Sequence, residues 1–172
     1  MPAIRFKEAP VFGLGKGSII ISLQKFNFLP GETISGSVAL TVKKPVKARE
    51  MSITLIGEQK VTRQVRTSSG MSTQTQTTRI YDFKQPLDGE KEYSGQASYP
   101  FSIKIPADIL GAGEVPPVPQ MTGTLAQGLQ FAQQFAAMTG AMPSARKKWY
   151  LEAKLDVPGG MDISKDADIV VG

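Results

Sequence analysis

The 172-residue sequence predicts an all-β protein, an antiparallel sandwich of about seven or eight strands. Apolar and polar residues alternate with a period of two through most of the stretch from Ile19 to Val61, as they do in strands with one buried face. The same alternation returns in residues 148–157, KWYLEAKLDV. The 17 glycines and 12 prolines favour many turns and argue against a helical bundle.

The first half of the chain predicts three strands. Residues 18–28 and 33–43 form two of them, and the turn Leu29–Thr33, LPGET, joins them. The third covers residues 46–64, where apolar positions are even-numbered before Arg49 and odd-numbered after it. This change of face indicates a bulge or bend, where a strand passes from one sheet edge to another.

The middle of the chain predicts a hairpin with a polar tip. Residues 67–78, TSSGMSTQTQTT, are polar and of low complexity, so we expect a solvated loop there. Pro100 has no N–H to donate, so its strand is expected at a sheet edge or kinked at that point. The later strands are expected at residues 79–83, 90–94, 99–105, 148–157 and 168–171.

The order of several short motifs resembles the arrestin family. The motifs are F-x-P-G-E at 28–32, I-x-G-x-V at 34–38, K-P at 44–45, L-x-G at 55–57, YPFSIKIP at 99–106, WYLEAKLD at 149–156 and IVV at 169–171. The resemblance covers residues 18–65, 97–110 and 148–171. It implies an immunoglobulin-like antiparallel β-sandwich of the arrestin type, and a non-enzymatic adaptor that binds other proteins.

Arrestins carry two such domains in tandem, whereas the length of this chain has room for one. We therefore expect residues 1–172 to form a single domain of a microbial type, with 1–17 as an extended lead-in and 111–147 as an insertion. The charged cluster that locks two-domain arrestins has no match here. The resemblance therefore does not imply receptor desensitisation.

The residue types argue against catalysis and cofactors. The chain has no Cys and no His, which excludes disulfides, Cys-based zinc sites and the usual acid–base side chain. Asp162, Asp166 and Asp168 are possible calcium ligands, but their spacing is not that of an EF-hand loop. The aromatic residues lie mostly at inward positions, so we expect no nucleic-acid binding. We expect no enzyme activity, no cofactor and no metal.

The insertion is the most unusual segment of the sequence. The 31 residues between Glu114 and Arg146 contain no charge. Near residues 121–140 the apolar positions cluster on one face and the glutamines on the other, which predicts an amphipathic helix. Arg146-Lys147-Lys148 follows directly. The candidate contact residues are Leu125, Leu129, Phe135, Arg146, Lys147 and Lys148.

Three roles for the predicted helix remain open. It caps the sandwich or joins two copies of the chain into a homo-oligomer, it binds a protein partner, or it docks on a membrane surface beside the basic triplet. Its uncharged polar face argues against strong electrostatic membrane binding.

Charge and hydropathy bear on partners and location. Residues 1–70 carry 11 Lys/Arg and 4 Asp/Glu, a net +7, whereas residues 71–172 carry 9 and 11, a net −2. The basic half suits an acidic partner or an anionic surface, or it reflects solvated strand edges. Because no segment reads as a signal peptide or a membrane span, we expect a cytoplasmic protein.

Overall fold

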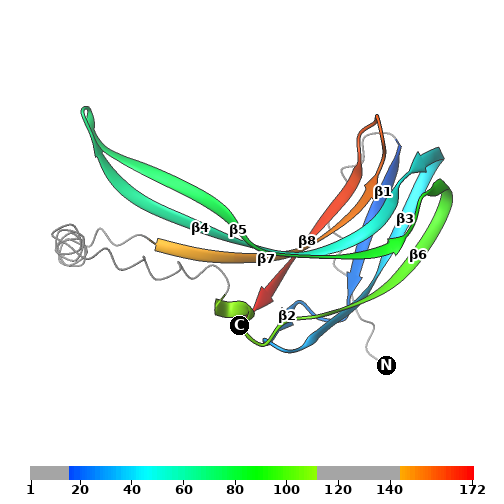
Figure 1. Ribbon diagram of the computed structural model, residues 1–172, viewed down its shortest axis with the longest axis horizontal. Coiled ribbons are helices and arrows are strands. Elements are labelled where there is room, and N and C mark those ends of the chain that lie inside the picture. The colour runs from blue at the N-terminus through cyan, green and yellow to red at the C-terminus, as the bar shows by residue number, and fades with distance from the viewer. Residues whose placement is uncertain (1–15, 112–143) are drawn as a thin grey trace, which may run out of the picture.

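The computed structural model describes residues 16–111 and 144–172, which form a two-layer β-sandwich with a long projecting hairpin (Figure 1). The strands are β1 (Gly17–Leu23), β2 (Asn27–Phe28), β3 (Thr33–Ala48), β4 (Glu50–Thr67), β5 (Gly70–Asp88), β6 (Lys91–Lys104), β7 (Ser144–Asp156) and β8 (Ile163–Val171). One 3₁₀ turn, η1 (Ile109–Gly111), follows β6. The helix predicted near 121–140 lies outside the described residues, as do Leu125, Leu129 and Phe135.

The strands form two sheets, which confirms the predicted all-β class. One sheet has the order β1-β3-β6 and the other the order β2-β8-β7-β4-β5. All the pairings are antiparallel except the short parallel pair of β2 with β8. The inward residues of both sheets make one core, in which Ile34, Leu55 and Leu151 are fully buried. Each such side chain contributes roughly 1.5–3 kcal/mol of hydrophobic stabilisation.

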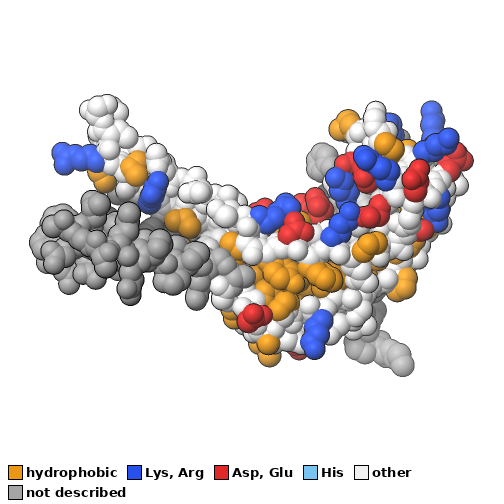
Figure 2. Space-filling view, in the orientation of Figure 1, with side chains coloured by type: hydrophobic (Ala, Val, Ile, Leu, Met, Phe, Trp, Pro, Cys, Tyr) orange, Lys and Arg blue, Asp and Glu red, His pale blue; other side chains and the backbone are white. Residues whose placement is uncertain are grey.

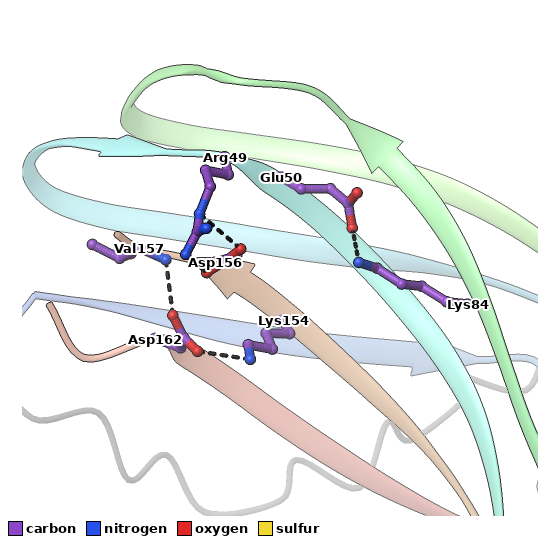
Figure 3. A network of polar contacts seen from close by, with 7 residues as sticks. All are labelled: Arg49, Glu50, Lys84, Lys154, Asp156, Val157 and Asp162. Carbon is purple, nitrogen blue, oxygen red and sulfur yellow. Dashed lines mark hydrogen bonds and ion pairs between the residues drawn. The ribbon is translucent and has the colours of Figure 1, made fainter. Parts of the chain in front are cut away.

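The predicted change of face at Arg49 is confirmed as the passage between the two sheets. Strand β3 ends at Ala48 in one sheet and β4 begins at Glu50 in the other. The Arg49 N–H donates to the Asp156 carbonyl at 2.8 Å, and its guanidinium Nε lies 3.2 Å from a carboxylate oxygen of Asp156 (Figure 3). An ion pair between Glu50 and Lys84 lies beside this corner.

The prediction of a loop over residues 67–78 was wrong, because strand β5 already begins at Gly70. The turn is confined to Ser68 and Ser69, and Gly70 has φ +131°, a conformation that glycine adopts without strain. Polar side chains pair across the two strands, such as the hydroxyls of Thr62 and Thr75 at 3.3 Å. The β-branched threonines suit a strand even where both faces are solvated.

A tight contact marks the place where the hairpin leaves the core. An ideal Cβ built on Gly57 would lie 2.2 Å from Cζ3 of the Trp149 ring, so the indole lies directly against the glycine backbone. The Tyr81 ring meets Trp149 edge-on at a centroid distance of 6.1 Å. We call residues 58–79, together with residues 144–148 of β7, the arm.

Replacing Gly57 by Ala tests this contact. We expect the free energy of unfolding to fall by about 1–3 kcal/mol, because the new methyl group must displace the indole or the backbone. Denaturant unfolding measures the change. Gly89→Ala is the matched control, because nothing lies within 4 Å of its Cβ position. In a Trp149→Ala background the cost of Gly57→Ala should shrink, and an undiminished cost would refute the proposed clash.

Candidate functional site

The structure separates the members of the predicted basic triplet. All three residues lie in β7, where alternation puts Arg146 and Lys148 on one face of the sheet and Lys147 on the other. The Lys148 ammonium lies 3.0 Å from a carboxylate oxygen of Asp168, and Lys147 donates a hydrogen bond to the Leu110 carbonyl. Among the described residues, Arg146 has no such partner. The triplet is therefore not one continuous patch.

A second candidate surface lies where the two sheets diverge from their corner. Strands β5 and β6 are the edge strands on this side, one in each sheet. Phe83 is 45% exposed at the β5 edge, while Leu87 and Tyr99 are half-buried against the core. Figure 2 shows hydrophobic side chains gathered between the positions of β5 and β6. We call this surface the open side of the sandwich.

The open side also contains a polar group without a partner. The side-chain oxygen Oε1 of Gln85 is buried and accepts no hydrogen bond from any described residue. Register places Gln85 beside Ile53 and Phe83 beside Leu55, so both side chains are on the core-facing side of the sheet. A buried carbonyl oxygen without a donor costs stability until a donor arrives.

A polar anchor closes the corner end of the open side. The Asp88 carboxylate accepts hydrogen bonds from the Tyr99 hydroxyl at 3.1 Å and the Gly89 N–H at 2.9 Å, and it pairs with Lys91 at 2.5 Å. The pKa of Asp88 is lowered, mainly because its carboxylate accepts a hydrogen bond from the Lys91 ammonium. Burial, together with Asp88, raises the pKa of Tyr99 to about 12.

The other face of the sheet, at the base of the arm, has its charges paired. The Tyr150 hydroxyl donates to Glu58 at 2.8 Å, and Arg79 pairs with Asp82 at 2.8 Å. The Lys148 ammonium also lies over the Tyr150 ring, 5.3 Å from its centroid. Burial, and then the bond to Glu58, raises the pKa of Tyr150 to about 12.

Two of the three aspartates weighed as calcium ligands, Asp162 and Asp168, have structural partners. Asp162 accepts the Val157 N–H at 2.8 Å and pairs with Lys154 at 2.7 Å (Figure 3), contacts that lower its pKa. In residues 16–111 and 144–172, no three or more Asp or Glu side chains come together to hold a metal ion. Within these same ranges, no helix has the length and apolarity to cross a bilayer.

Sequence reasoning missed Phe83 and Gln85. It placed the Pro100 strand at an edge or kinked there, and the position of β6 in its sheet confirms the edge. Pro86 was the corresponding signal on β5, because proline within a sheet is typical of edge strands. Prolines in both strands therefore indicate that β5 and β6 are edge strands.

Tyrosine ionisation tests the burial of these rings. The chain has four tyrosines, and burial is the main reason that the pKa of each is raised. The pKa rises to about 12 for Tyr93, Tyr99 and Tyr150. In an alkaline titration followed by tyrosinate absorbance, the midpoint pH of the folded chain should therefore lie well above that of the denatured chain, which is near pH 10. The unfolded state loses these protons first, so stability from this source falls as the pH rises from about 10 to 12. Coincident titration curves for the folded and denatured chain would contradict the burial.

The comparisons with known proteins agree on the fold. The solved structure of Spo0M, a sporulation control protein from Bacillus subtilis, resembles this chain with a TM-score of 0.52 and 18% sequence identity. The similarity covers 92% of this chain and 50% of Spo0M, so the chain spans half the length of that protein. No curated protein matches the sequence.

A family match supplies the assignment. Residues 17–114, from the start of β1 past the 3₁₀ turn, match the family described as Arrestin (or S-antigen), N-terminal domain. The match spans more than half of the chain and covers the corner, the hairpin and both strands of the open side. The resemblance expected from the sequence is thus confirmed, and this chain belongs to the arrestin N-terminal domain family.

Proposed function

We propose that this protein is a non-enzymatic adaptor that binds an extended segment of a protein partner along the open side of its sandwich. Membership of the arrestin family supports an adaptor-type module. The observation that carries the proposal is the half-exposed Phe83 on an edge strand whose far side pairs with no other strand in residues 16–111 and 144–172. An edge of this kind offers free backbone N–H and C=O groups to an incoming strand.

Strand β5 is the better receiver of the two edges. Its residues from Gly70 to Gln85 contain no proline, so each residue there keeps its backbone N–H donor, and no described strand pairs with the far edge. Strand β6 has Pro100 near its middle, which removes one donor. The bound segment would therefore pair with β5 near Phe83.

The partner chemistry follows from the side chains of the open side. Alternate side chains of an added strand point to the same face, so an apolar residue would pack on Phe83. A donor two residues away along the segment would reach the buried oxygen of Gln85. Burying the exposed half of Phe83 contributes roughly 1 kcal/mol, so backbone pairing and the partner's own apolar residue must supply most of the affinity.

A peptide library selected against the folded chain tests this proposal. We expect enrichment of extended peptides with apolar residues at alternate positions, and loss of their binding in Phe83→Asp. Met161→Asp is the matched control, because Met161 is an apolar side chain, 69% exposed, in the turn between β7 and β8. Selected peptides that bind Phe83→Asp as well as the unchanged chain would refute the open side as the binding site.

A second candidate is attachment to a membrane through the predicted helix near 121–140 and the adjacent basic triplet, Arg146-Lys147-Lys148. The uncharged, amphipathic pattern of that segment supports it. We expect Leu129→Asp to weaken co-flotation of the chain with anionic liposomes. Flotation that does not change in Leu129→Asp would remove this candidate.

We also propose that the same helix joins two copies of the chain into a homo-oligomer. Residues 1–172 form a single domain in this proposal, and the protein is cytoplasmic.

A further inference from the structure

We propose that one face of the arm binds an anionic lipid surface. This site lies outside the open side, so it does not depend on the adaptor function. It shares Arg146 with the second candidate function, but it does not use residues 121–140. The binding residues are Lys60, Arg66 and Arg146, which we call the basic stripe. All three side chains are exposed, and none has a partner among the described residues.

The register of the strands puts the basic stripe on one face. Lys60 of β4 lies directly opposite Arg146 of β7, and Arg66 is six residues along β4 from Lys60, so it shares that face. Like charges placed directly opposite each other in a sheet destabilise it. Residues 59–78 and 144–148 contain no Asp or Glu that would offset this repulsion. Figure 2 likewise shows Lys and Arg, but no acidic side chains, on the visible face of the arm.

Protection against aggregation does not account for Lys60. Lysines serve that purpose on edge strands, where they hinder pairing with another chain. Lys60, however, lies in the middle strand of the arm, paired to Thr77 of β5 on one side and Arg146 on the other. At the base of this face the charged side chains are paired with carboxylates or hydroxyls. On this face of the described arm, the cations without a partner therefore lie in its outer part.

The spacing of the stripe selects a lipid surface over a compact anion. Six residues along a strand separate Lys60 from Arg66 by roughly 20 Å, so their side chains do not converge on one phosphate. The described part of the arm contains no aromatic residue on which a nucleic-acid base would stack. Met71, which is 65% exposed, lies opposite Arg66 near the tip and offers an apolar group to the headgroup boundary.

Vesicle sedimentation tests the proposal. The unchanged chain should bind vesicles of phosphatidylserine and phosphatidylcholine, and should not bind phosphatidylcholine alone. In Lys60→Gln/Arg66→Gln/Arg146→Gln, partitioning at low salt should fall on the order of 100-fold, about fivefold for each basic residue. Lys43→Gln/Lys44→Gln/Lys47→Gln is the control, because it removes the same charge from exposed positions of β3 in the sandwich. This control should bind nearly as the unchanged chain does.

Three results would overturn the proposal. The first is an equal loss of vesicle binding in the stripe and control variants, which would mean that net charge alone attracts the chain to the vesicles. The second is unchanged vesicle binding in the stripe variant, with thermal unfolding showing both variants to be folded. The third is a stripe variant that loses binding to polyglutamate or to a DNA duplex while its vesicle binding persists, which would assign the stripe to an acidic protein or to nucleic acid.

Discussion

The contact of the Trp149 indole with the backbone of Gly57 determines where the core ends and the arm begins. On the core side of this contact β4 is buried on both faces, and beyond it none of the residues of the same strand is buried. Any side chain at position 57 would occupy the space of the indole, so only glycine lets the tryptophan close the end of the core. A register shift between Gly57 and Glu58 follows directly, as expected where a strand bends out of a sandwich.

The open side begins at the other end of β4 and β5, where the chain passes from one sheet to the other. The chain crosses between the sheets at Arg49, and the bonds of Arg49 to Asp156 fix the crossing to the end of β7. From this corner β4 and β5 run toward the arm while β3 and β6 follow the other sheet (Figure 1). The edges of β5 and β6 therefore separate, which leaves Phe83 with a partly uncovered ring.

Sequence reasoning predicted the sandwich, the crossing at Arg49 and the edge position of β6, because each leaves a period-two or proline signal in a short window. It did not predict the length of β5, since threonine and glutamine on both faces produce no apolar alternation. The positions of Phe83 and Gln85 could not be predicted without the pairing of β5 with β4, which joins residues roughly 30 positions apart. The triplet at 146–148 shows the same limit, because cations consecutive in sequence lie on opposite faces of a strand.

The proposed function requires β5 to accept an added strand at the open side. Hydrogen–deuterium exchange of the folded chain, with and without a selected peptide, tests it most directly. The amides of β5 near Phe83 that point away from β4 are solvated in the free chain and should slow on binding, while those bonded to β4 change little. Protection at the edge of β1, or along β8 before its short pairing with β2, with no change in β5, would refute strand addition at the open side.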